Sequence, residues 1–183
     1  ETALDMFLYG GTDTFATPPS AITAWVQRWA PGFDLPYVHV STITDNFNRN
    51  VVMSRYPFQD LNGDGAAVRS RLYTILPDPN VPWMAGGNDG IRGFINAEIN
   101  LPDSTYAGDL VVLCGHMRSG SASSDLAERL SAGQNIAYYV DYVYNGAGTG
   151  VPDPHARVID SPQVTSILPP LTPVVLGGDW NED

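Results

Sequence analysis

The order of hydrophobic and polar residues predicts a short helix and two strands in the first third of the chain. Between Ile22 and Trp29, apolar residues recur at i, i+3, i+4 and i+7, which predicts an amphipathic helix with Ser20 as its N-cap. Residues 37–43 and 51–53 are rich in β-branched and aromatic side chains. That composition predicts a strand for each, separated by a polar, asparagine-rich loop.

The second half of the chain contains stronger patterns. Residues 92–101 and 109–116 are apolar stretches joined by a turn at 106–108, so we expect an antiparallel hairpin. Residues 123–145 predict the longest helix, which ends at an Asn-Gly pair, and 173–176 predict a short apolar strand. The predicted buried face of this helix consists of six side chains: Leu126, Leu130, Ile136, Tyr139, Val140 and Val143.

These elements and the length of 183 residues predict a single α/β domain over 1–183. A weakly alternating stretch, 71–76, adds a strand before Pro77. Strands in antiparallel pairs with helices between them are typical of α+β or mixed α/β folds. With 43% hydrophobic and only 16% charged residues, the chain has the composition of a compact protein, which excludes disorder over most of its length.

The charge of the chain restricts its partners. The net charge is −11, and all nine basic residues are arginines. Such a surface lacks the diffuse positive field that attracts nucleic acid or anionic lipid, so a phosphate substrate would need a few arginines or a bound cation. No apolar run is long enough to span a membrane. Low lysine with high Asp, Gly and Thr content favours an extracellular or periplasmic location, and the single Cys114 is interpreted as a small buried hydrophobic residue.

Polar side chains stand directly beyond two of the predicted strands. His116 follows the apolar run 110–113, and Asp179 and Asn181 follow 173–176. Catalytic residues often occupy such positions. Taken separately, a histidine after a strand is more often structural, and an aspartate after Gly-Gly is commonly a turn residue.

An ordered set of five motifs resembles the endonuclease/exonuclease/phosphatase superfamily, the deoxyribonuclease-like fold. The set consists of Ser-Arg-Tyr-Pro at 54–57, Arg92 in a strand, Cys-Gly-His at 114–116, a helix containing Arg129, and Gly-Asp-Trp-Asn at 178–181. The order and spacing are more specific than any single motif. The resemblance covers about residues 35–183 and implies a four-layer α/β sandwich, in which two packed, mainly antiparallel sheets are flanked by helices.

The resemblance implies a metal-dependent phosphoester hydrolase. Asp179 would orient or deprotonate the attacking water, Asn181 would donate a hydrogen bond to a phosphoryl oxygen, and His116 would act on the phosphate or leaving oxygen as an acid or transition-state stabiliser. Arg92 is a candidate phosphate clamp, because its planar fork binds phosphate through two hydrogen bonds; the alternative is a surface strand residue paired with an acid. The implied cofactor is Mg²⁺, or Mn²⁺ or Ca²⁺.

Further parts of the family's site have no counterpart here. The family also uses an Asn and a Glu upstream and an Asp and a Ser-Asp-His triplet downstream, whereas this sequence has no Ser-Asp-His. We therefore expect the chain to be the middle of a longer domain that includes the first and last strands. Glu1 is a candidate for the metal-binding Glu; otherwise it is an arbitrary first residue. On this hypothesis the 183-residue chain alone is inactive or nearly so.

Other readings of the sequence stay open. A non-catalytic binding or scaffold member of the same fold is the alternative function. The substrate could be a nucleic acid, a phospholipid, a nucleotide or a small phosphate ester. Residues 60–65 match the first half of a calcium loop, but the twelfth position is Arg71, which favours a plain turn. His39 and His155 are not predicted to be metal ligands, and Trp83 and Trp180 could stack on a substrate.

Overall fold

A computed structural model describes residues 2–41, 49–60, 65, 69–70, 94–141, 168–169 and 171–181. Its elements run α1 (Thr2–Leu8), β1 (Gly11–Asp13), β2 (Ser20–Ile22), α2 (Trp25–Trp29), β3 (Tyr37–Val40), β4 (Val51–Ser54), β5 (Arg69–Ser70), β6 (Ile95–Ile99), β7 (Leu110–His116), α3 (Ser123–Asp141) and β8 (Val174–Asp179). This is a mixed α/β architecture.

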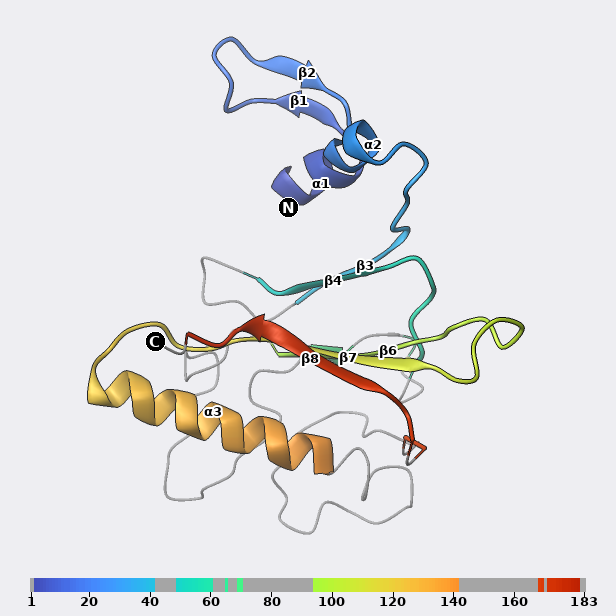
Figure 1. The fold of residues 1–183 in the computed structure, drawn as a ribbon. Helices are drawn as coiled ribbons and strands as arrows, with labels where there is room; N and C mark the ends of the chain where they lie inside the picture. The colour runs from blue at the N-terminus through green and yellow to red at the C-terminus, as the bar shows by residue number, and fades with distance from the viewer. Residues whose placement is uncertain are drawn as a thin grey trace.

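The largest sheet has the strand order β5-β6-β7-β8 (Figure 1). The predicted hairpin is confirmed, since β6 and β7 pair antiparallel with Ile95 opposite Cys114 and Ile99 opposite Leu110. β8 then pairs parallel to β7. A parallel neighbour cannot be reached by a tight turn, and α3 lies in the crossover connection that parallel strands require.

Other elements lie on both sides of the four-stranded sheet, although Val174, Val175 and Leu176 of β8 stay exposed. Figure 1 shows the β3–β4 pair over one face and α3 along the other. Val52 of β4 packs with the fully buried Ile95 and Ala97 of β6, and Cys114 lies partly buried beside them. Burial raises the pKa of the Cys114 thiol, in keeping with its predicted role as a small buried hydrophobic residue.

The buried face of α3 differs from the predicted one. Ile136 is buried as predicted, but Leu126 and Leu130 are 48% and 62% exposed, and the buried residues in the described part of the helix are Arg129, Ala132 and Ile136. These three lie at i, i+3 and i+7, which is the spacing of one helix face. The prediction assigned only apolar residues to the buried face of the helix and therefore left out Arg129. The side chains of three further predicted face residues lie outside the described part: Tyr139, Val140 and Val143.

The N-terminal segment also departs from the prediction. The helix there is only α2, its N-cap is Ala24, and Ser20 begins β2 instead of capping a helix. β2 pairs antiparallel with β1, whose Asp13 accepts hydrogen bonds from the backbone N–H groups of Phe15 and Ala16 and so turns the chain. This pairing, together with α1, was not predicted.

Some of the remaining predicted elements are found in the structure, whereas others lie outside the described residues or are not shown. The strands predicted at 37–43 and 51–53 correspond to the antiparallel β3–β4 pair, and the strand at 173–176 extends to Asp179. The predicted strand 71–76 lies outside the described residues. The four-layer sandwich is not shown by the described elements, which form three small sheets. Among these elements, no helix is long and apolar enough to cross a membrane.

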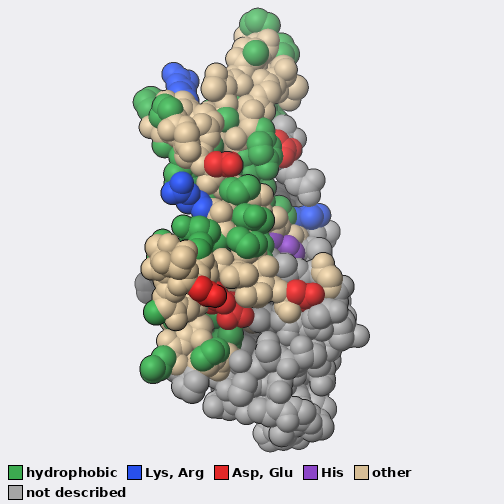
Figure 2. All heavy atoms as spheres, turned by 90° about the vertical axis from the view of Figure 1, so that its right-hand side faces the viewer, with side chains coloured by type: hydrophobic (Ala, Val, Ile, Leu, Met, Phe, Trp, Pro, Cys, Tyr) green, Lys and Arg blue, Asp and Glu red, His purple; other side chains and the backbone are tan. Residues whose placement is uncertain are grey.

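Aromatic side chains reach the surface of the N-terminal segment. Phe15 and Trp29 are 80% and 79% exposed, and Tyr9 is 67% exposed. Figure 2 shows hydrophobic side chains along the upper part of one face, where this segment lies. The guanidinium of Arg28 stacks 5.2 Å from the Trp29 ring centroid, which covers part of that ring.

Candidate active site at the carboxyl ends of two parallel strands

The parallel pairing of β7 and β8 brings His116 and Asp179 together. The two residues are register partners at the last position of the ladder. Because the carboxyl ends of parallel strands meet at one edge of a sheet, side chains that the sequence places after separate strands become neighbours. The sequence placed His116 and Asp179 at the ends of separate strands, and the structure makes them register partners.

The side chains of His116 and Asp179 approach each other without a direct hydrogen bond. His116 Nε2 lies 3.6 Å from Asp179 Oδ2, which is longer than a hydrogen bond between these atoms. The imidazole is 20% exposed and the carboxylate 61% exposed, so both reach solvent. A water molecule or a phosphoryl oxygen at this edge can therefore contact both groups.

A tight turn after β8 fixes the carboxylate. The backbone N–H of Asn181 donates to Asp179 Oδ1 at 3.0 Å, which leaves Oδ2 as the oxygen on the side of His116. Asn181 has a positive φ of 49°, a conformation that asparagine tolerates better than most residues. An asparagine at this position is therefore suited to the turn as well as to chemistry.

Asn181 is tied back to the end of β7. Its Nδ2 donates to the carbonyl of Met117 at 2.8 Å, and the N–H of Met117 donates to the carbonyl of Asp179 at 2.9 Å. An amide group carries two N–H donors and a carbonyl oxygen. The bond to Met117 therefore orients Asn181 and leaves one N–H and Oδ1 for a ligand.

The glycine before Asp179 allows the strands to approach closely. Gly178 has φ +141°, and a Cβ at this residue would lie 1.8 Å from the carbonyl oxygen of Gly115. Neither the backbone angle nor the contact is open to another residue type. A glycine directly before Asp179 is thus required by the geometry of the site edge.

An arginine that the sequence analysis did not name lies in the connection from β7 to α3. Arg118 Nε is 3.2 Å from Asp125 Oδ1 and 3.6 Å from Glu128 Oε2, and its side chain is 39% exposed. Its position two residues after His116 is the sequence signal that could have identified it. Five guanidinium N–H donors allow it to hold these acids and an anion together.

Two of the predicted site residues, Arg92 and Glu1, lie outside the described residues. The described part of the chain contains no group of three or more His, Cys, Asp or Glu side chains placed to hold a metal ion. Asp179 Oδ2 and Asn181 Oδ1 are nevertheless oxygen donors of the kind that Mg²⁺ binds, and Mg²⁺ commonly uses one or two carboxylates and keeps several waters. The donor chemistry of this edge therefore fits such an ion.

The other residues discussed from the sequence either make local structural contacts or lie outside the described residues. Burial lowers the pKa of His39, which lies half-buried in β3, so a neutral imidazole is favoured there. The backbone N–H of Gly65 donates to Asp60 Oδ2 at 3.0 Å, and residues 61–64 of this loop lie outside the described residues. Ser54 is buried, and its Oγ accepts the N–H of Tyr56 just after β4. His155 and Trp83 lie outside the described residues.

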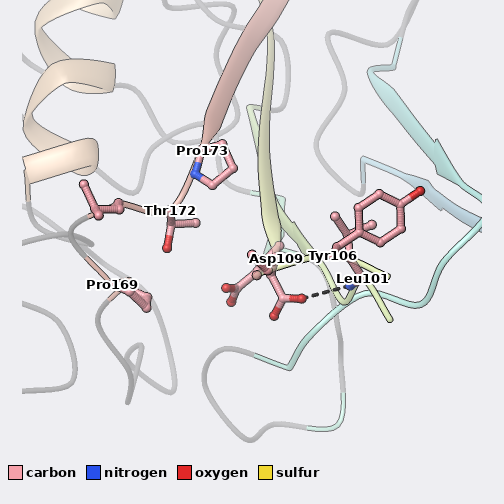
Figure 3. A pocket seen from close by; sticks show the side chains of 10 residues that line it. Leu101, Tyr106, Asp109, Pro169, Thr172 and Pro173 are labelled. Carbon is pink, nitrogen blue, oxygen red and sulfur yellow. Dashed lines mark hydrogen bonds between the residues drawn. The ribbon is translucent and has the colours of Figure 1, made fainter. Parts of the chain in front are cut away.

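A separate pocket of about 630 Å³ lies at the opposite end of the same sheet. Its walls come from the β6–β7 connection and from the residues before β8 (Figure 3). Asp109 Oδ1 accepts the N–H of Leu101 at 2.8 Å, as drawn in Figure 3. Burial raises the pKa of Glu98 in this pocket, and the charge of Asp109 raises it further.

The substitution Glu98→Gln is expected to stabilise the protein at neutral pH. The pKa of Glu98 is higher in the folded protein than in the unfolded chain. The contribution of Glu98 to the free energy of unfolding is therefore greatest below pH 4.5 and falls as the pH rises through the raised pKa. The neutral amide of glutamine does not ionise, so the substitution removes this loss of stability. The gain in the free energy of unfolding is small because water screens the half-exposed carboxylate of Glu98. Urea unfolding at several pH values measures the effect. A variant less stable than wild type at pH 7, or a gain that persists at pH 3, would contradict the prediction.

Comparisons of the chain with protein-family models, with curated proteins and with solved structures gave no match.

Proposed function

We propose that this chain carries the active-site edge of a divalent-metal-dependent phosphoester hydrolase of the endonuclease/exonuclease/phosphatase type, with that family's four-layer sandwich. The observation that supports this best is the parallel register of β7 and β8, which sets His116 opposite Asp179 with Asn181 tied to the same edge. The proposal combines this arrangement with the ordered motifs of the sequence.

Each of the three side chains has a task that its geometry permits. Asp179 Oδ2 is free of the turn and orients or deprotonates the attacking water. The second N–H of Asn181 donates to a phosphoryl oxygen, and the half-buried His116 protonates the leaving oxygen or stabilises its charge. Asn181 Oδ1 would be an oxygen donor from this edge to the cation, which when bound neutralises phosphoryl charge and polarises the phosphorus–oxygen bond.

The proposed substrates are small or lipid phosphate esters in preference to duplex nucleic acid. A chain with net charge −11 and no lysine repels an extended polyanion, whereas a single phosphate can be held locally by Arg92, Arg118 and a cation. An extracellular or periplasmic location is proposed on composition alone.

Hydrolysis by the complete gene product tests the proposal. Bis(4-nitrophenyl) phosphate, sphingomyelin, inositol phosphates and plasmid DNA would each be incubated with Mg²⁺ or Mn²⁺, and with EDTA. We expect the small or lipid esters to be hydrolysed, EDTA to reduce the rate to background, and added Mg²⁺ or Mn²⁺ to restore it. Hydrolysis that EDTA leaves unchanged would overturn the metal dependence. No hydrolysis of any substrate would favour a non-catalytic binding role.

A further inference from the structure

The buried side chain of Arg129 in helix α3 contacts the connection between β7 and α3, next to the candidate site. Arg129 is only 8% exposed. Its Nη1 donates to the carbonyl of Arg118 at 3.1 Å and to that of Gly120 at 2.8 Å. Both acceptors belong to residues 117–122, the segment that links His116 at the end of β7 to the start of α3.

The same segment holds Asn181. Its first residue, Met117, accepts the Asn181 amide through its carbonyl at 2.8 Å and donates its N–H to the carbonyl of Asp179 at 2.9 Å. Arg129 and Asn181 thus bind the same short stretch of backbone at successive points. The position of the Met117 carbonyl, and with it the orientation of the Asn181 amide, depends on where residues 117–122 are held.

The conformation of residues 117–122 is demanding. Gly120 has φ +118°, and a Cβ there would lie 2.3 Å from Asp125 Oδ2. Asp125 Oδ2 in turn accepts the N–H of Ala122 at 3.1 Å, and its Oδ1 faces Arg118 Nε at 3.2 Å. Arg129 adds a fixed cationic donor to two carbonyls that no helix or sheet ladder pairs in the described residues.

Stability alone does not explain an arginine at this position. Its Nε is buried with no hydrogen-bond partner in the described structure. Burying a guanidinium carries a desolvation penalty, and apolar side chains of similar size often replace buried charges without loss of stability. A rigid guanidinium does, however, hold two carbonyl oxygens in one arrangement, which neither methionine nor lysine reproduces.

We propose that Arg129 is a positioning residue: it fixes residues 117–122 so that the Met117 carbonyl orients the Asn181 amide beside His116 and Asp179. The effect on catalysis rests on the proposed function. The effect on the Asn181 amide does not, so the two are separable by experiment.

The test uses Arg129→Met, Arg129→Lys and a matched control, Arg28→Met, in the complete gene product. Arg28 is an exposed arginine of α2, so its substitution makes the same chemical change far from residues 117–122 in sequence. The first measurement is the pair of kinetic constants for bis(4-nitrophenyl) phosphate with Mn²⁺. The second is the NMR signal of the Asn181 side-chain amide, assigned by its loss in Asn181→Asp, and its rate of hydrogen exchange.

We expect kcat of Arg129→Met to fall by about 10- to 100-fold, because small displacements of a positioned group are that costly to rate. KM should stay within about twofold, since ground-state binding is little affected. Arg129→Lys should retain an intermediate kcat, and Arg28→Met should match wild type. In Arg129→Met the Asn181 amide signal should shift and exchange faster.

Several outcomes would overturn the inference. A lower melting temperature for Arg129→Met with unchanged kcat would show a merely structural role. If wild type hydrolyses no phosphoester, the proposed function fails and the NMR measurement decides: an Asn181 amide identical in Arg129→Met and wild type overturns the positioning role. If Arg129→Met does not fold, the same comparisons are made with Arg129→Lys, and a kcat and amide signal equal to wild type overturn it.

Discussion

Asp179→Asn in the complete gene product is expected to lower metal-dependent phosphoester hydrolysis by about 100-fold or more, the usual contribution of a general base. The amide is nearly the same size as the carboxylate, and its Oδ1 can still accept the N–H of Asn181. The turn after β8 is therefore retained. What is lost is the basic, negatively charged Oδ2 that lies 3.6 Å from His116 Nε2.

Folding provides the check on this prediction. Asp179 is 61% exposed, so its substitution should change the free energy of unfolding by no more than about 0.5 kcal/mol. The matched control is Asp103→Asn, an exposed aspartate in the β6–β7 connection, which should leave the rate unchanged. A folded Asp179→Asn protein that keeps half of the wild-type rate would show that Asp179 does not act as the general base.

Gly178→Ala is expected to destabilise the fold by more than about 3 kcal/mol, well above the usual effect of a point substitution. Its added Cβ would lie 1.8 Å from the carbonyl oxygen of Gly115, a backbone atom that cannot rotate away. The backbone at φ +141° is also closed to alanine. Either the β7–β8 ladder separates at this point or the protein unfolds.

The neighbouring glycine is an internal control for this prediction. A Cβ on Gly177 would meet nothing within 4 Å, and its φ lies outside the positive range. Gly177→Ala should therefore change the free energy of unfolding by about 1 kcal/mol or less. Urea unfolding of both variants, followed by circular dichroism, compares them directly. Equal stabilities for the two variants would show that the close approach at Gly178 is not maintained in solution.

The sequence predicted the strands and the side chains at the edge of the site, but not the hydrogen bonds that hold these side chains in place. The family resemblance placed His116 and Asp179 in one site, but the parallel pairing of β7 and β8 that makes them neighbours was not predicted. The bond from Asn181 to the Met117 carbonyl was not predicted. A backbone carbonyl has the same chemistry at every residue, so no sequence pattern marks it.

Two elements show where local patterns mislead. The apolar periodicity of α3 pointed to Leu126 and Leu130, yet the helix buries Arg129, whose guanidinium donates hydrogen bonds to two backbone carbonyls. The apolar spacing from Ile22 to Trp29 predicted a helix throughout. Residues 20–22 instead pair with β1, since a turn organised by Asp13 brings the two short strands together.

The parallel pairing of β7 and β8 also has a consequence for the order of folding. The β6–β7 hairpin closes over a short loop, whereas β7 and β8 meet only after the whole of 117–173 has been brought back to the sheet. Contacts between distant segments form later than local ones, because the entropy of closing a long loop is lost before the contacts form. We therefore expect His116 to be in place on its hairpin before Asp179 arrives, so that partly folded chains contain the histidine side of the site without its carboxylate.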